Sequence, residues 1–305
     1  MEYRWSLEKL YKSFEDEKFL EDNKNMPILL DDFISWTKKN ITILTKENLE
    51  EFLKKNIEIK KSFERLMAFG QLSYTVNVKD ENAKRLIEQC ENLFVKFTEI
   101  EVIFAESLKN TENLENIINS SDFLKEHSFY LLEIKEDTKY MLSKSEELAI
   151  EKIKNTGSRA WSKLQETLTA TLNIEVEVDG EKKTLPLPAI RNLAYEDSQD
   201  TRKSAYYAEL KAYERIDESV ASALNAIKGE AIQETEMRAY DSILSRTLKD
   251  SRIQEKTLTA MLEAMKESLP NFAKFLKKKA DLLAHNLHLA VVLRRVRLER
   301  EEGVH

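Results

Sequence analysis

Residues 83–104 read AKRLIEQCENLFVKFTEIEVIF, and this stretch has the clearest periodicity in the chain. Its apolar side chains recur at spacings of three, four and seven residues: Leu86, Cys90, Leu93, Phe97 and Phe104. That is the repeat of an amphipathic helix with one buried face. The stretch therefore predicts a long helix packed into a core, with Cys90 as a buried, inert thiol rather than a nucleophile.

The composition of the whole chain also favours helices. Its 305 residues include only 5 glycines and 4 prolines, so few positions can supply sharp turns. Charged residues make up 34% of the chain with both signs interspersed, and the net charge of −7 gives no electrostatic reason to bind nucleic acid. A single cysteine excludes an intramolecular disulfide. With no apolar segment of signal-peptide or membrane-spanning length, we expect a cytoplasmic protein with no membrane partner.

Two further apolar stripes are interpreted as helices with core-facing positions. The first runs from Tyr206 to Ala231, over about seven turns, with Asp217 interrupting it. The second runs from Leu258 to Leu269, and Pro270 is expected to end or kink it before another helix begins.

Two breaks in the pattern lie earlier in the chain. The polar segment Glu21–Asp32 contains Pro27 and is predicted to link two N-terminal helices. The segment 155–158 (NTGS) is predicted to cap or kink the helices on either side of it.

One segment departs from the helical repeat, at residues 172–187 (LNIEVEVDGEKKTLPL). Ile174, Val176 and Val178 alternate with polar residues, and Asp179-Gly180 follows them, which is the local signature of a hairpin with a type I′ turn. The fold class is thus mostly α, a helical array with one small β-hairpin at about 172–187. Such a hairpin is either a structural flap packed on helices or an edge that an extended peptide could join, and the flap is favoured.

The residue types used in catalysis do not form a recognisable site. The chain has four histidines, His127, His285, His288 and His305, and no H-E-x-x-H. His285 and His288 could share a helix face, but a metal bound by them would need distant ligands. The adjacent carboxylates at 50–51 and 146–147 are interpreted as surface charge. No G-x-S-x-G elbow or phosphate-binding glycine loop is present. The residues alone therefore name no catalytic, cofactor-binding or metal-binding position.

Five segments together resemble the N-terminal half of the oligoendopeptidase F family. They are residues 5–14 (WSLEKLYKSF), 158–172 (SRAWSKLQETLTATL), 185–207 (LPLPAIRNLAYEDSQDTRKSAYY), 223–230 (ALNAIKGE) and 238–246 (RAYDSILSR). Their order and spacing carry the resemblance, which extends from about Trp5 to about Leu283.

The resemblance implies a largely helical zinc metallopeptidase of the thimet-oligopeptidase-like group, with a deep channel that admits short peptides. The zinc ligands and the general base of that family lie in its C-terminal half, so no residue here inherits such a role. We therefore expect no cofactor in this chain, although the full-length family holds zinc. Four regions are expected: 1–110, helical; 111–190, helical and ending in the hairpin; 191–285, the start of the peptidase region; and 286–305, an atypical tail.

The tail departs from the family pattern. Residues 287–305 read LHLAVVLRRVRLEREEGVH, where the family would continue into an aromatic, aspartate-bearing stretch. A foreign or shifted-frame sequence, an engineered end and a divergent truncated paralogue all fit this tail. Its basic cluster, Arg294, Arg295, Arg297 and Arg300, is given little functional weight.

Two functions follow from the resemblance. The chain is either an N-terminal peptidase fragment that forms one wall of the peptide channel and is inactive alone, or a non-enzymatic helical protein that binds peptides or a partner protein. A plain helical scaffold is disfavoured by the order of the five segments. The apolar residues of about 255–285 are expected to stay partly open, so the chain is predicted to self-associate, to swap elements between copies or to cover them with its tail.

Overall fold

A computed structural model describes residues 6–178 and 180–282 of the chain. These residues form two compact units, which are described separately: residues 6–160 with 237–239, and residues 161–236 with 240–282. The described structure is mostly helical and contains one two-stranded antiparallel sheet, so the predicted fold class is confirmed. The finer division at residues 110 and 190 remains a prediction.

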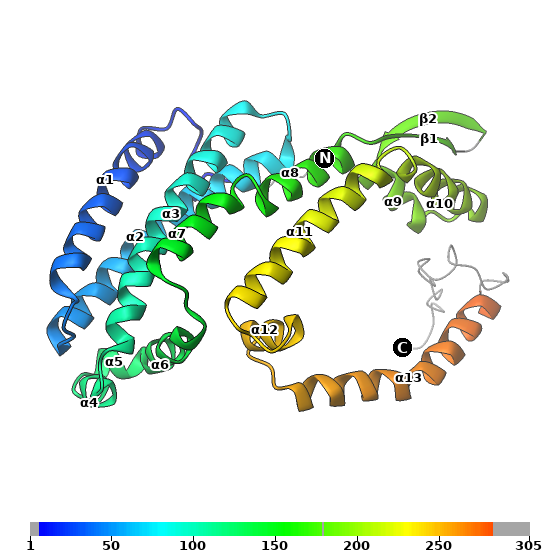
Figure 1. The fold of residues 1–305 in the computed structure, drawn as a ribbon. Coiled ribbons are helices and arrows are strands. Elements are labelled where there is room, and N and C mark those ends of the chain that lie inside the picture. The colour runs from blue at the N-terminus through cyan, green and yellow to red at the C-terminus, as the bar shows by residue number, and fades with distance from the viewer. Residues whose placement is uncertain (1–5, 179, 283–305) are drawn as a thin grey trace, which may run out of the picture. The chain divides into compact units, whose positions relative to one another are not determined.

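The first unit is built from helices. Their bounds are α1 Glu17–Asn40, α2 Lys46–Val76, α3 Glu81–Lys109, α4 Leu114–Asn119, α5 Asp122–Glu126, α6 Ser128–Asp137 and α7 Lys144–Lys154, with a 3₁₀ turn at Thr138–Tyr140. The three long helices α1, α2 and α3 pack side by side (Figure 1), and α7 lies along α3. Helix α8, Ser158–Ala170, begins in this unit and continues into the second.

Aromatic rings fill the core of the first unit. Phe52 of α2 stacks on Phe104 of α3, with ring centroids 4.1 Å apart, and Phe33 of α1 lies 5.3 Å from Phe52. A second aromatic group joins Tyr11 and Phe19 to Phe69 in edge-on or tilted contacts. The α3 prediction is confirmed: every apolar residue named for its stripe is buried, including Cys90 at 1% exposure.

The predicted break at Glu21–Asp32 is wrong, because α1 runs through Pro27 without interruption. Proline removes one backbone donor, but a buried stripe from Phe19 to Ile34 holds the helix against α2 and α3. The polar residues of the segment have tertiary partners instead of forming a loop. Tyr11 donates its hydroxyl proton to Asp22 at 2.7 Å, and Lys96 pairs with Asp31 at 2.7 Å.

The break at residues 155–158 is confirmed. Helix α7 ends at Lys154, and the Gly157 N–H donates to the Ile153 carbonyl at 2.8 Å before α8 begins at Ser158.

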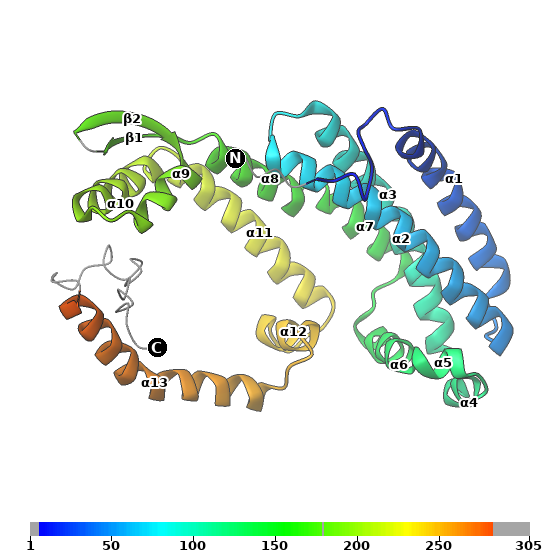
Figure 2. The same ribbon diagram turned by 180° about the vertical axis from the view of Figure 1, so that it is seen from behind.

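The second unit contains the sheet and the later helices. Their bounds are β1 Asn173–Val178, β2 Glu181–Pro186, α9 Leu187–Asn192, α10 Gln199–Tyr213, α11 Asp217–Met237, α12 Ile243–Asp250 and α13 Glu255–Leu282, with a 3₁₀ turn at Leu193–Tyr195. The hairpin lies over α9 and α10 (Figure 2). Ile174, Val176 and Val178 point into a small core that they share with α9 and α10.

The hairpin has the register that the sequence implies. Asn173 faces Pro186 and Val178 faces Glu181, which leaves a two-residue loop at positions 179 and 180. Gly180 has a φ of +79°, as a type I′ turn requires of its second residue. Asp179, the other turn residue, lies outside the described residues.

Replacing Gly180 with valine should lower the free energy of unfolding by about 1 kcal/mol or more, because a β-branched residue resists positive φ. No atom lies within 4 Å of an added Cβ there, so the loss would come from the backbone alone. Gly229 is the matched control, since it lies within α11 with the same open space. Gly229→Ala should instead stabilise by about 0.5–1 kcal/mol. An unchanged melting midpoint for Gly180→Val would count against the turn.

The long helix predicted from Tyr206 to Ala231 is two helices, so that prediction is wrong. Helix α10 ends at Tyr213 and α11 begins at Asp217, whose carboxylate accepts from the Glu218 N–H at 2.7 Å. The polar interruption at Asp217 marks a helix start. The stripe is not a core face either, because Leu210 and Leu224 are about half exposed while Ala205, Ala212 and Ala223 are buried.

Pro270 does not end a helix, since α13 continues from Glu255 to Leu282. Of the two predicted effects of Pro270, the kink agrees with the structure. The axis of α13 changes direction about midway along the helix in both views (Figures 1 and 2). The flanking residues are mostly strong helix formers, which helps the helix to tolerate the donor that proline lacks.

Candidate functional site

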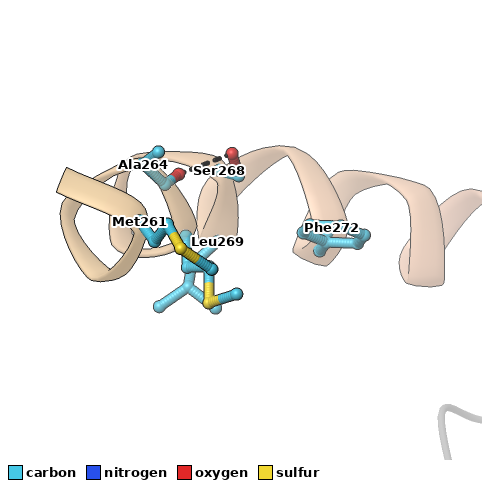
Figure 3. Close-up of a pocket in the computed structure, with 6 residues that line it drawn as sticks. Met261, Ala264, Ser268, Leu269 and Phe272 are labelled. Carbon is cyan, nitrogen blue, oxygen red and sulfur yellow. Dashed lines mark hydrogen bonds between the residues drawn. The ribbon is translucent and has the colours of Figure 1, made fainter. Parts of the chain in front are cut away.

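One side of α13 exposes a row of apolar side chains in the second unit. Met261, Met265, Leu269 and Phe272 follow one another at spacings of four, four and three, so they lie on one side of the helix. Each is between 46% and 62% exposed. With Ala264 and Ser268 they line a shallow depression of about 530 Å³, which we call the α13 groove (Figure 3). The Ser268 hydroxyl donates to the Ala264 carbonyl at 2.8 Å, so this polar group is satisfied within the helix.

The rest of α13 is also open. Leu262, Phe275 and Leu282 are exposed by about half or more, and Ala280 alone is buried among the described residues of the helix. An amphipathic helix normally buries its apolar side, and each Å² left in water forgoes about 25 cal/mol. The interpretation of the stripe from Leu258 to Leu269 as a core face is therefore wrong. The expectation that apolar residues at about 255–285 stay partly open is confirmed for the residues that the structure describes. Leu283 lies outside these residues.

Helices α11 and α12 have few buried apolar residues of their own. Helix α11 buries Ala223, Glu234 and Thr235, and the described residues of α12 include none that is buried. Arg246 of α12 pairs with Glu234 at 3.2 Å and donates to the Thr235 hydroxyl at 3.2 Å, so polar contacts join these helices. The core of the unit lies at the hairpin, α9 and α10, and α11–α13 present apolar side chains with little to cover them.

The contacts of the hairpin favour its interpretation as a structural flap packed on helices. Its buried residues pack on α9 and α10, which explains how a two-stranded sheet is stable here. Strand β2 is exposed along most of its length and carries Lys182 and Lys183. Lysines on an edge strand are typical of edges protected from pairing with another chain.

The one histidine within the described residues has a local partner. His127 lies at the junction of α5 and α6, with Nδ1 2.8 Å from the Phe123 carbonyl and its ring 4.5 Å from the Phe123 ring. His285, His288, His305 and residues 286–305 with their arginines lie outside the described structure, as does Trp5. Across residues 6–178 and 180–282, no three metal-ligating side chains gather closely enough to hold an ion.

Cys90 lacks the environment of a nucleophile. It is packed in the core between α3 and its neighbours, and burial raises the pKa of its thiol to about 12. A thiol with this pKa remains protonated at neutral pH, and the thiolate is the reactive form.

The paired carboxylates do not all behave as surface charge, so that prediction is wrong for Glu147. Its side chain is 10% exposed and accepts two hydrogen bonds from the Arg238 guanidinium, at 2.6 and 2.8 Å. The Leu142 N–H also donates to it, at 3.0 Å. Its neighbour Glu146 caps α7 by accepting from the Ser143 N–H at 2.9 Å, and hydrogen bonds from Ser143 lower the pKa of the Glu146 carboxyl. Both carboxylates therefore have structural partners.

No helix in the described parts of the chain combines the length and apolar character needed to cross a bilayer.

The comparisons of this chain with known proteins, by sequence and by structure, agree with one another. The sequence model of the Oligopeptidase F family matches residues 110–173. Oligoendopeptidase-F from Enterococcus faecium has the same fold over 92% of this chain, with a TM-score of 0.77 at 15% sequence identity. A candidate peptidase from Chlamydophila abortus matches over 95% of the chain with a TM-score of 0.61 at 17% identity, and a candidate oligoendopeptidase F from Bacillus anthracis strain Ames matches over 85% with a TM-score of 0.64 at 11% identity. No curated protein matches the sequence.

The described structure therefore has the fold that these solved chains share. The expected resemblance to the N-terminal half of oligoendopeptidase F is confirmed by the sequence match and the shared fold. The chain spans about half the length of these relatives, namely 57%, 49% and 46% of the three solved chains.

Proposed function

We propose that this chain forms the N-terminal half of an oligoendopeptidase F-like zinc metallopeptidase and supplies one wall of a channel that admits short peptides. The observation that carries the proposal is the fold shared with the Enterococcus faecium oligoendopeptidase-F across 92% of the chain. The family match at residues 110–173 supports it from sequence. The lone thiol, Cys90, fits a reducing location, and we propose the cytoplasm.

The residues described here do not fit a zinc site. A catalytic zinc needs three protein ligands and an open position, and the described part of the chain brings no such group together. The full sequence also lacks H-E-x-x-H. We therefore assign no catalytic step to these residues. Their proposed role is to shape the channel, exclude folded proteins and position the peptide, while catalysis belongs to a C-terminal half.

The isolated chain is expected to hold no stoichiometric zinc and to cleave no peptide, because its sequence lacks H-E-x-x-H and residues 6–178 and 180–282 bring no three ligands together. Elemental analysis after mild chelation, alongside a quenched fluorescent peptide, checks both expectations. Tight one-to-one zinc with chelator-sensitive cleavage would refute the assignment of catalysis to a C-terminal half.

The proposed function itself is tested on the protein as the cell makes it. An antibody raised against residues 6–178 isolates the native protein, whose intact mass, zinc content and peptidase activity are then measured. A protein about twice this length, with zinc and activity, supports the proposal. A native protein of 305 residues without zinc contradicts it.

The second candidate is a non-enzymatic helical protein that binds peptides or a protein partner. The open α13 groove favours it, because contiguous apolar surface on a folded protein marks interaction sites. The same isolation separates the two functions: a short, zinc-free native protein that brings one stoichiometric partner supports binding.

A further inference from the structure

We propose that the α13 groove is occupied by α13 of a second copy of this chain, packed antiparallel in a two-fold dimer. The proposal concerns the 305-residue chain and does not rest on the peptidase function. It follows from the apolar content of the groove, the amount of surface left open and the distribution of charge along the helix.

The groove offers apolar surface that another such helix complements. Met261, Met265, Leu269 and Phe272 form a stripe of unbranched, γ-branched and aromatic side chains, the residue types that interdigitate when helices pair. The groove walls are carbon and sulfur apart from Ser268, whose hydroxyl bonds within its own helix. A partner helix with an apolar face would leave no polar group buried and unpaired in the α13 groove. The same stripe on α13 of a second copy is such a face.

The open area is sufficient for a dimer. The apolar residues of α13 that are exposed by 46% or more are Met261, Leu262, Met265, Leu269, Phe272, Phe275 and Leu282. At roughly 100 Å² apiece, about half of a large apolar side chain, their complete burial would give at most roughly 700 Å² per copy, or roughly 1,400 Å² for a pair. A stable interface buries about 1,200–2,000 Å² in total. One α13 face against another therefore reaches the lower part of that range.

Charge along α13 selects the antiparallel orientation. The first half carries Glu255, Glu263 and Glu267 against Lys256 and Lys266, a net charge of −1. The second half carries Lys274 and the run 277–279 (KKK) against Asp281, a net charge of +3. A parallel pair places the two basic halves together, whereas an antiparallel pair sets each basic half beside the acidic half of its partner. Opposed helix dipoles add to the same preference.

A two-fold axis between residues 270 and 271 gives the most consistent register. It places Leu269 opposite Phe272 of the second copy and Met265 opposite Leu276.

Sedimentation of the full 305-residue chain over a wide concentration range tests the proposal. We expect a monomer–dimer equilibrium whose dissociation constant rises about tenfold or more in Leu269→Glu, because a carboxylate would be buried in the apolar interface. Thr259→Glu is the matched control: it adds the same charge to α13 at an exposed residue outside the groove and away from the proposed axis, and it should leave the equilibrium unchanged. Circular dichroism confirms that both variants keep their helices.

Thiol cross-linking tests the orientation. With Cys90 buried, the new thiol in Ser268→Cys is the reactive one, and a short bis-maleimide should join two copies through it because it lies near the proposed axis. Thr257→Cys lies near the start of α13 and should not cross-link to itself, although it would in a parallel pair. Efficient trapping at Thr257 overturns the antiparallel arrangement.

Three results overturn the dimer itself. One is a monomer at all concentrations. Another is a dimer that Leu269→Glu leaves intact. The third is open-ended aggregation without a defined dimer.

Discussion

Replacing Arg238 with leucine is expected to lower the free energy of unfolding of the first unit by about 3 kcal/mol. The substitution leaves the Glu147 carboxylate nearly buried, with two of its three described hydrogen bonds removed. Breaking a buried ion pair from one side costs about 3–5 kcal/mol, and the 16% exposure of the Arg238 side chain argues for the lower end. The next residue, Ala239, has a φ of 56° just after the end of α11, where the Tyr240 N–H donates to the Thr235 carbonyl at 3.2 Å.

A double-mutant cycle separates the ion pair from packing. Glu147→Leu combined with Arg238→Leu should lose less stability than Arg238→Leu alone, because no charge is then left buried. Lys125→Leu is the control, since Lys125 and Asp122 form an exposed pair at 3.0 Å, and its effect should stay within about 0.5 kcal/mol. Chemical denaturation, followed by Trp36 fluorescence in a chain with Trp5 and Trp161 replaced by phenylalanine, provides the measurement. Equal losses in Arg238→Leu and Lys125→Leu would show that the pair adds no stability.

The sequence predicts this fold well where one helix face is buried along its whole length. The stripe of α3 is regular because both α1 and α2 pack against it, so periodicity and burial coincide. The hairpin is equally clear, since its alternating residues face a local core and Gly180 takes the positive φ that its turn needs. In both elements, local pattern and tertiary packing require the same residues.

The predictions fail where tertiary contacts outweigh a local rule. Pro27 signals a break, yet the buried face of α1 carries the helix through it. The apolar spacing from Tyr206 to Ala231 suggests one helix because 3.6-residue periodicity can persist across a short turn, here between Tyr213 and Asp217. No local pattern could reveal the pairing of Glu147 with Arg238, which lie 91 residues apart in the sequence.

The candidate site was partly visible in the sequence. The apolar residues of α13 have an obvious helical spacing, and composition alone does not say whether such a face is buried. The resemblance to the N-terminal half of a larger peptidase suggested that part of it would be open, and the exposed Met265, Leu269 and Phe272 agree.

Truncating Phe52 to alanine is expected to lower the free energy of unfolding of the first unit by about 4 kcal/mol. Phe52 is 1% exposed, stacks on Phe104 at 4.1 Å and lies 5.3 Å from Phe33. Its ring therefore joins α1, α2 and α3 at one point. These helices are long and packed on both sides, so they can relax only partly into the space left by the ring, and a cavity penalty adds to the lost burial.

The same substitution at Phe129 provides the control, because that ring is 61% exposed on α6 and its removal should cost well under 1 kcal/mol. Phe52→Leu should fall between the two, since leucine restores much of the volume without the stacking. If Phe52→Ala cost no more than Phe129→Ala in the Trp36 assay, the three helices would not share one cooperative core. A large loss confined to Phe52 supports instead a single core shared by α1, α2 and α3, as expected of the channel wall that we propose.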